Sequence, residues 1–372
     1  MNTATTFLVA RDRLTNTMVQ SAPVQDQADL KPGQVLLKVD RFAFTANNIT
    51  YAVTGDVLGY WQFFPAGHGQ GIVPVWGFAD VELSRCDGVE VGERLYGYYP
   101  MSTHLLVEPQ QLGSASFIDG AAHRQGLSVI YNQYIRCAKD PLYHGSSEAL
   151  QMLLRPLFTT SFLLDDFFED NQFFAANTIV LTSASSKTAL GLGFLLHHNR
   201  EKRGIHYQIV GLTSAGNMKF VQGLGCYDKV LGYDQIDELA VDKPTVTVDF
   251  TGNAELLSKL HNHLRDSLKY SCLVGATHWD QRAGRSKDLA GPSPKMFFAP
   301  SHAEKRISDW GGAGFQIRIS QVWTEFAGFV DGWMDVEEGF GADAVETIYH
   351  EILAGRVNPQ KGYILSMWKE SI

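Results

Sequence analysis

The stretch Thr178-Ile-Val-Leu-Thr-Ser-Ala-Ser-Ser-Lys-Thr-Ala189 decides the fold. Its apolar start, Thr178–Leu181, is typical of a buried strand, and a turn of small residues, Thr182–Ala189, follows. A segment with helical character, Leu190–His198, comes next. Strand, tight turn and helix in this order predict the start of a parallel βαβ unit. Such a unit places the free N–H groups of a helix N-terminus at a strand end, where an anion binds.

The alternation continues on the C-terminal side of this stretch. Five further strands are predicted, separated by helical segments: Tyr207–Gly211, Asp228–Tyr233, Thr245–Phe250, Ser271–Gly275 and Lys295–Pro300. We expect short helices before Gly225, over 234–241 and over 253–264, and a long one within 301–332. The series predicts an α/β fold with a doubly wound parallel sheet of Rossmann type.

The N-terminal part has a different pattern. Short strands with Gly and Pro turns recur about every ten residues up to residue 110, which indicates a small barrel or partly open sandwich. Mixed helical periodicity over 121–139 favours a helical insertion at about 114–150, followed by two helices over 148–158 and 160–168. We therefore expect three parts: a β-rich catalytic domain over 1–150, a dinucleotide-binding domain over 151–330, and a C-terminal return to the first domain over 331–372.

Composition excludes several classes of protein. The net charge of −9 at pH 7 argues against a nucleic-acid or anionic-membrane partner. No run of about 18 apolar residues is present, and residues 1–24 lack a signal-peptide pattern. The four cysteines are scattered without a CxxC motif, which favours reduced thiols in a cytoplasmic protein.

The chain resembles the medium-chain dehydrogenase/reductase superfamily, in its zinc-free, quinone oxidoreductase-like branch. Four segments carry the resemblance in the family's order: Val91–Gly97, Arg155–Ser161, Phe220–Gly225 and Ala344–Leu365. The resemblance implies a GroES-like β-barrel domain beside the Rossmann domain. It also implies hydride transfer with a nicotinamide cofactor, and pairing into a homodimer through the sheet edge at 295–300.

The first turn departs from the family's glycine-rich pattern. Ser183, Ser186, Lys187 and Ala189 stand where the family's turn has glycines. Hydroxyls and an ammonium group can hold a diphosphate where bare backbone would otherwise do so. A lysine at a helix start is also easier to explain if an anion lies beside it. We therefore expect Ser185, Ser186, Lys187 and Thr188 to bind the cofactor.

The end of the second strand indicates which cofactor is bound. An NAD site places Asp or Glu there, whereas residues 211–225 contain no carboxylate. Ser214, Asn217 and Lys219 suit a 2′-phosphate instead, so the sequence favours NADP(H). By resemblance to the family, further cofactor contacts are expected at these positions: Tyr233, Thr251, Gly252, Gly275 and Ala276.

No metal site is expected. Zinc-containing members of the family need a Cys in the segment that matches Ala46–Asn48, and none is present. Gly67-His68-Gly69 lacks the Glu of the family's GHE motif, and the other histidines do not have metal-ligand spacing.

Without a metal, hydride transfer relies on donors that polarise a carbonyl. Tyr51 matches the family's active-site tyrosine, and Asn47 and Asn48 lie in the same loop. Three aromatic residues that follow are candidates for the wall of a substrate pocket: Tyr60, Trp61 and Phe64. The hypothesis is that Tyr51 donates to the carbonyl of an α,β-unsaturated (enone or enoyl) substrate or of a quinone.

Two other classes of function stay open. The replaced glycines are also compatible with a retired enzyme that acts as a binding protein. A lyase or isomerase step on the same fold is the third possibility. Titration with NADPH separates these alternatives: binding without turnover points to a binding protein or to an untested substrate, and no binding of NADPH or NADH excludes the oxidoreductase.

Overall fold

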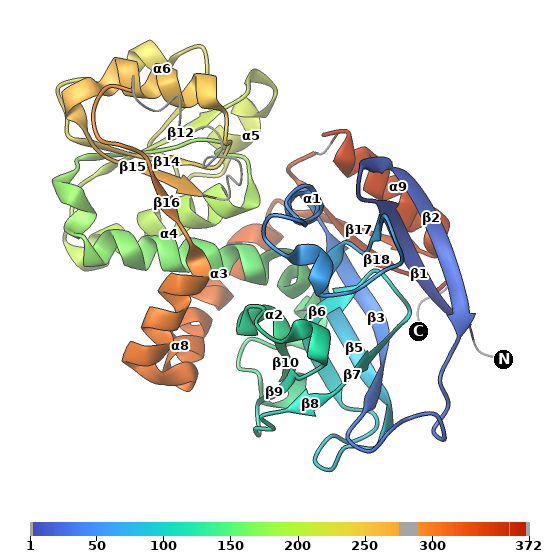
Figure 1. The fold of residues 1–372 in the computed structure, drawn as a ribbon. Coiled ribbons are helices and arrows are strands. Elements are labelled where there is room, and N and C mark those ends of the chain that lie inside the picture. The colour runs from blue at the N-terminus through green and yellow to red at the C-terminus, as the bar shows by residue number, and fades with distance from the viewer. Residues whose placement is uncertain (1–2, 275–288, 357, 370–372) are drawn as a thin grey trace. The chain divides into compact units, whose positions relative to one another are not determined.

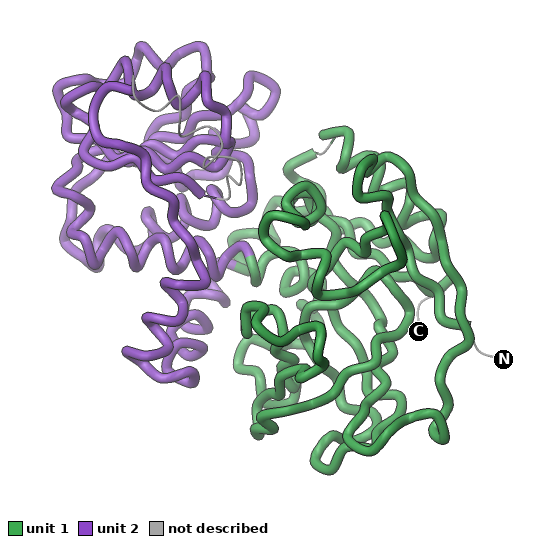
Figure 2. Tube along the Cα trace, in the orientation of Figure 1, with its two compact units in different colours: residues 1–156, 327–372 green, residues 157–326 purple. Residues whose placement is uncertain are grey.

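The computed structural model describes residues 3–274, 289–356 and 358–369. The chain divides into two compact units (Figure 2): unit 1 comprises residues 1–156 and 327–372, and unit 2 comprises residues 157–326. The chain leaves unit 1 within helix α3 (Glu148–Asp170) and returns to it within helix α8 (Ala299–Asp331). Unit 1 is therefore built from both ends of the chain.

Unit 2 contains a parallel sheet with the strand order β13-β12-β11-β14-β15-β16, six strands within the described residues. The strands are β11 (Thr178–Leu181), β12 (Gln208–Thr213), β13 (Lys229–Gly232), β14 (Thr245–Asp249), β15 (Leu268–Val274) and β16 (Lys295–Phe297). The first strand of the series is central, and the order reverses beside it. This is the doubly wound arrangement that the sequence predicts.

Helices cover both faces of this sheet (Figure 1). Helix α4 (Lys187–Arg203) lies on one side, and α6 (Ala254–Leu264) lies on the other. Helix α5 (Met218–Gly223) follows β12. All four residues of β11 are buried, as expected for a strand covered on both faces, and this explains its uninterrupted apolar and β-branched sequence.

Unit 1 is an antiparallel β structure closed by its C-terminal segment. A larger sheet has the order β17-β18-β3-β5-β6-β10-β9-β8, with β7 paired to β3, and a smaller one has the order β2-β1-β4. Their bounds are β1 Thr3–Ala10, β2 Arg13–Pro23, β3 Val35–Phe44, β4 Gln70–Gly71, β5 Pro74–Ser84, β6 Arg94–Pro100, β7 His104–Val107, β8 Pro109–Gln110, β9 Ser116–Asp119, β10 Gln133–Arg136, β17 Asp335–Phe340 and β18 Lys361–Ser366.

The C-terminal return completes unit 1. Strand β18 pairs with β3 in antiparallel fashion and with β17 in parallel fashion. Helix α9 (Ala342–Leu353) places Val345, Tyr349 and Ile352 in the same core as Phe7 and Phe44. The expected closing helix and strand are confirmed, and the chain contains both a β-rich unit and a Rossmann-type sheet.

The expected helical insertion at about 114–150 is wrong in its secondary structure. The segment contains β9 and β10, and its only α-helix before α3, within the described residues, is α2 (Val129–Asn132). Tyr134 and Ile135, which continue the apparent helical stripe, lie in β10 and pair with β9 or β6. Pairing with existing strands overrides the local 3.6-residue pattern.

Two smaller expectations also differ from the structure. The two helices expected over 148–168 are one continuous helix, α3, with Pro156 inside it. The helix expected over 234–241 is only a 3₁₀ turn, Ile236–Glu238. Within the described residues, each helix is too short or too polar to traverse a lipid bilayer.

Candidate functional site

The turn between β11 and α4 is the first candidate site. It lies at the carboxyl end of the central strand, where ligands of doubly wound sheets bind. Ser186 is the N-cap residue of α4, and its hydroxyl accepts a hydrogen bond from the Ala189 N–H at 3.4 Å. Lys187 and Thr188 form the first turn of that helix. The predicted residues Ser185, Ser186, Lys187 and Thr188 are therefore contiguous at a helix N-terminus.

Ser183 performs the role of a glycine in this turn. Its φ of 50° lies in the left-handed region, which residues other than Gly, Asn and Asp rarely adopt. Its backbone N–H donates to the Tyr233 hydroxyl at 3.2 Å, at the end of β13. Tyr233 thus contacts the turn directly and holds the backbone in this conformation.

Ser185 joins the turn to the end of the second strand. Its hydroxyl accepts from Asn217 Nδ2 at 3.0 Å and lies 3.5 Å from the Thr213 hydroxyl. Ser214 and Lys219 are exposed nearby in sequence, on either side of Asn217. The structure therefore brings Ser185 and Asn217 together, as expected for two groups that share one ligand site.

Lys187 carries the one ammonium group of the β11–α4 turn. Burial lowers the pKa of Lys187 from 10.5 to about 8. The first turn of α4 contains no acidic side chain. Burial of an ammonium group and its position at the positive end of a helix dipole both disfavour the charged form.

The end of β14 is organised by Asp249, whose side chain is buried. Asp249 accepts hydrogen bonds from the hydroxyl of Thr182 at 2.6 Å and from that of Thr251 at 2.7 Å, and from the Gly252 N–H at 3.2 Å. This fixes the backbone of Thr251 and Gly252 next to the first turn. The other two expected contacts, Gly275 and Ala276, lie outside the described residues.

A cluster of aromatic side chains in unit 1 surrounds Tyr51. Tyr51 lies in α1 (Ala46–Val53), and its ring centroid is 4.5 Å from that of Tyr60 and 5.7 Å from that of Tyr98. We call the following set the tyrosine cluster: Tyr51, Tyr60, Phe63, Phe64, Trp76, Tyr98 and Tyr131. Burial raises the pKa of Tyr51, and the neighbouring Tyr60 adds to this effect. Tyr51 is therefore a neutral hydrogen-bonding group at physiological pH.

The other residues predicted around Tyr51 have different surroundings. Asn48 is committed to the structure, because its oxygen caps α1 at Thr45 and its Nδ2 donates to the Pro74 carbonyl at 2.9 Å. Trp61 is buried against Gly55 and Gly71 and belongs to the main core of unit 1. Tyr60 and Phe64 do lie in the tyrosine cluster.

Sequence reasoning did not single out Trp76, Tyr98 or Tyr131. Tyr98 lies on strand β6 and Trp76 on β5, and their rings are 5.0 Å apart. The signal in the sequence is the run Tyr96-Gly-Tyr98, which places two tyrosines on one face of a strand.

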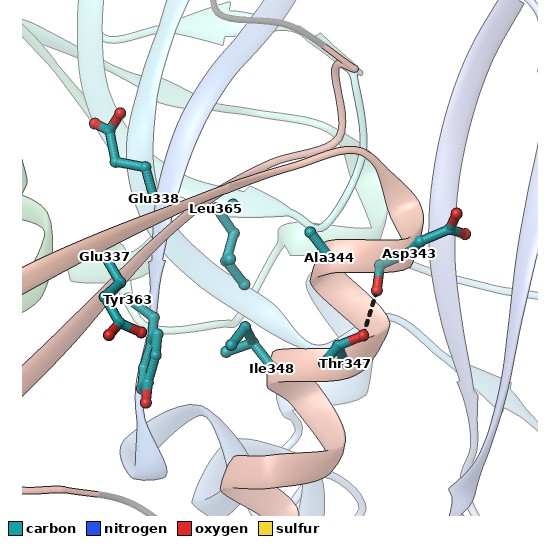
Figure 3. Close-up of a pocket in the computed structure, with 9 residues that line it drawn as sticks. Glu337, Glu338, Asp343, Ala344, Thr347, Ile348, Tyr363 and Leu365 are labelled. Atoms are coloured by element: carbon teal, nitrogen blue, oxygen red, sulfur yellow. Dashed lines mark hydrogen bonds between the residues drawn. The ribbon is translucent and has the colours of Figure 1, made fainter.

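A separate surface pocket of about 320 Å³ lies between α9 and the β17–β18 pair (Figure 3). Ile348 and Leu365 form its apolar part. Its two glutamates are ion-paired, Glu337 with Lys361 and Glu338 with Arg41. None of the site residues predicted from the sequence lines it.

In the described part of the chain, no three His, Cys, Asp or Glu side chains gather in a way that could hold a metal ion. The search for similar proteins found none among curated proteins.

Solved structures with the same fold are numerous, at low sequence identity. CurA from Vibrio vulnificus, also solved with NADPH, has a TM-score of 0.63 and 11% identity, with 99% of this chain and 100% of that chain covered. A mutant enoyl thioester reductase from Candida tropicalis has a TM-score of 0.57 and 10% identity, with coverage of 98% and 100%. The quinone oxidoreductase from Coxiella burnetii has a TM-score of 0.53 and 10% identity, with coverage of 98% and 99%. These likenesses confirm the medium-chain dehydrogenase/reductase fold.

One family profile matches the chain over residues 42–358, which is most of its length. Its members are described as proteins of unknown function, DUF2855. The chain therefore belongs to the DUF2855 family, and it has the fold of the medium-chain dehydrogenases/reductases.

Proposed function

We propose that this protein is an NADPH-dependent, metal-independent oxidoreductase that reduces a conjugated carbonyl compound: an enone, an enoyl derivative or a quinone. When bound, NADPH supplies the hydride. The chain's own residues hold the cofactor in unit 2, and they bind and polarise the substrate in unit 1.

The observation that carries the proposal is the β11–α4 turn with Lys187. A helix N-terminus at the central strand, a left-handed residue before it and a desolvated ammonium group within it form a suitable cradle for a diphosphate. The residues fit the ligand although glycines are missing, because hydroxyl and ammonium donors replace close approach of the backbone.

The preference for NADPH over NADH rests on the end of β12. No carboxylate occurs over 211–225 to hold a ribose diol. Ser214 and Lys219 are exposed there, and Asn217 is half-buried and already joined to Ser185. These donors suit a 2′-phosphate. Three of the structures with this fold, including CurA, contain NADPH or NADP, which supports the same assignment.

The substrate class rests on the tyrosine cluster. Tyr51 is a neutral hydroxyl with a raised pKa, so it can donate a hydrogen bond without losing its proton. The rings around it favour a flat, uncharged molecule. A mutant of Etr1p, which has the same fold, was solved with NADP and crotonyl-CoA, which supports a conjugated carbonyl. Replacement of Tyr51 by Phe with no loss of turnover would remove it from this role.

The alternative proposal is a retired or non-redox member of the fold. The observation in its favour is that the Ser185 hydroxyl is already bonded to Asn217, and that the Ser183 N–H is already bonded to Tyr233. Two groups near the turn are therefore satisfied within the protein.

Titration with NADPH and with NADH, followed by nicotinamide fluorescence, distinguishes the two proposals. We expect saturable binding of NADPH, weaker binding of NADH, and oxidation of NADPH at 340 nm when enones or quinones are added. If the protein bound neither NADPH nor NADH, the assignment as an oxidoreductase would be overturned. Binding without turnover across enones, enoyl thioesters and quinones would favour the binding protein.

A further inference from the structure

Tyr227 contacts the β11–α4 turn from the connection between α5 and β13. Its hydroxyl donates to the Ala184 carbonyl at 3.0 Å and to the Ala189 carbonyl at 3.2 Å, sharing one proton between them. Ala184 lies before the helix, and Ala189 lies in the first helical turn of α4. One hydroxyl therefore bridges the two ends of the segment Ser185–Thr188, which contains the residues that we assign to the cofactor.

The ring of Tyr227 lies in a slot that two glycines leave open. A Cβ at Gly211 of β12 would lie 2.9 Å from the ring's Cδ1, and a Cβ at Gly193 of α4 would lie 3.0 Å from its Cζ. Both distances are shorter than an ordinary van der Waals contact between carbon atoms. The packing of β12 and α4 against the ring thus fixes the position of the hydroxyl. Burial raises the pKa of Tyr227, so the hydroxyl keeps its proton and remains a donor.

Two other hydrogen bonds fix the backbone at the start of the turn. The Ala184 N–H donates to the Leu212 carbonyl of β12 at 3.0 Å, and the Ser183 N–H donates to the Tyr233 hydroxyl at 3.2 Å. Both backbone groups of Ala184 are therefore bonded, one to a strand and one to Tyr227. The chain enters the turn in a conformation that these contacts determine.

The replaced glycines give this bridge its importance. Where side chains stand in place of glycine, the donors of the turn reach a phosphate only if the backbone that carries them is correctly placed. A site whose donors are in place before the ligand arrives loses less conformational entropy on binding. By linking Ala184 to Ala189, the Tyr227 hydroxyl restricts the segment between them.

We propose that Tyr227 is a positioning residue for the cofactor, and that its hydroxyl holds the β11–α4 turn in the shape that receives the 5′-diphosphate of NADPH. This inference rests on the proposed function. Tyr227 acts through the carbonyls of Ala184 and Ala189. Its effect is therefore on the 5′-phosphate, whereas the donors proposed for the 2′-phosphate follow β12.

The test compares two ligands that differ in one phosphate group. Adenosine 2′,5′-bisphosphate has both phosphates, and adenosine 2′-monophosphate lacks the 5′-phosphate. Isothermal calorimetry on the full-length protein measures the affinity for both ligands and for NADPH. Tyr227→Phe keeps the ring and removes the bridge. We expect its Kd for the bisphosphate and for NADPH to rise about 5- to 10-fold, the effect of one hydrogen bond, and its Kd for the monophosphate to stay unchanged.

Tyr207→Phe is the matched control. Tyr207 is buried, and its hydroxyl donates to the Leu196 carbonyl of the same helix at 2.9 Å. Leu196 lies about two helical turns beyond Ala189, away from the binding turn. Both variants thus lose a hydroxyl that donates to a carbonyl of α4. We expect both to lower the melting temperature by a similar amount, and only Tyr227→Phe to lose affinity for the bisphosphate.

Gly193→Ala disturbs the same bridge from the side of α4. The added methyl group would lie 3.0 Å from Cζ of Tyr227, the atom that carries the hydroxyl, and so pushes the hydroxyl away from the carbonyls. We expect the same selective loss of affinity for the bisphosphate. This variant decides the question if Tyr227→Phe does not fold, because alanine favours a helix more than glycine does.

The outcomes separate the inference from the proposed function. If the wild type binds neither the bisphosphate nor NADPH, both are overturned. If the wild type binds them and Tyr227→Phe binds the bisphosphate equally well, the inference alone fails. It also fails if Tyr227→Phe loses affinity for both adenosine ligands by the same factor, since this indicates a general loosening of unit 2. A selective loss in Tyr207→Phe would contradict it as well.

Discussion

At the scale of single residues, two residues have properties that the fold alone does not favour: one has an unusual backbone conformation, and the other has a buried charge. Ser183 adopts a left-handed backbone without being glycine, and Lys187 is desolvated at a helix N-terminus. Both lie within the segment Thr182–Ala189. Strain that persists at one place is typical of a binding site, because a ligand compensates for it.

Lys187→Met tests this reading of the turn. We expect the dissociation constant for NADPH to rise about 10- to 100-fold, since a hydrogen bond to a charged group contributes about 1.5–3 kcal/mol. Isothermal calorimetry measures the change. Lys202→Met, near the C-terminal end of the same helix, is the control and should bind NADPH as the wild type does. Equal affinity in both variants would contradict the assignment of Lys187.

The pH dependence follows from the same side chain. Because the pKa of Lys187 is lowered to about 8, the free protein loses this charge above that pH, and NADPH affinity should fall there in the wild type but not in Lys187→Met. Between about 8 and 10.5 the unfolded state binds more protons at this lysine than the folded state does. The contribution of Lys187 to the stability of the ligand-free protein therefore rises with pH in this window.

At the scale of elements, the position of α4 depends on its close approach to α3. The Ser161 hydroxyl of α3 donates to the Thr188 carbonyl at 2.8 Å, in the first turn of α4. Gly191 makes this approach possible, because a Cβ there would lie 2.7 Å from the Ser161 oxygen. The first turn that holds Lys187 is thus fixed by packing one helical turn further along.

Gly191→Ala is expected to destabilise the protein by about 1–3 kcal/mol through overpacking, and to weaken NADPH binding as the first turn of α4 shifts. Chemical denaturation and fluorescence titration measure the two effects. Gly223→Ala in α5 is the control, since a Cβ there meets no atom within 4 Å. It should be neutral or stabilising. A stable Gly191→Ala variant would show that α3 and α4 can move apart freely.

At the scale of the whole molecule, the two units differ in whether they are formed by one continuous segment of the sequence or by two distant segments. Unit 2 is one continuous segment, whereas unit 1 joins residues 1–156 to residues 327–372 through the β3–β18 pairing. Among the described residues, β16 is the last strand of the unit 2 sheet, and Met296 within it and Phe298 directly after it are 47% and 56% exposed. An exposed edge with apolar side chains favours pairing with a second copy.

We therefore predict a homodimer through β16, as the resemblance to the family first suggested. Light scattering coupled to size exclusion should give twice the chain mass for the wild type and the chain mass for Met296→Asp. Met18→Asp on β2 is the control, because Met18 is equally exposed but lies in unit 1. A wild-type monomer at micromolar concentration would exclude the dimer.

The sequence by itself determined the Rossmann-type unit. The run Thr178–Leu181 is buried on both faces and the turn after it is made of small residues, so composition and local period are sufficient to identify strand, turn and helix. It also predicted that Ser185, Asn217 and Tyr233 lie close to one another, because each follows a strand of the same sheet, and in the structure Asn217 donates to Ser185 and Tyr233 accepts from the Ser183 N–H. Carboxyl ends of parallel strands meet at one edge whatever the details of packing are.

Only the tertiary structure decided the region around Arg124. The segment 121–139 has helical periodicity, yet Tyr134 and Ile135 form a strand because β6 and β9 offer their backbone groups. In the same region the Arg124 guanidinium lies over the ring of Phe64, which is more than 50 residues away in the sequence. A local pattern cannot show which distant strand will accept a segment, since that choice depends on the free energy of the assembled sheet.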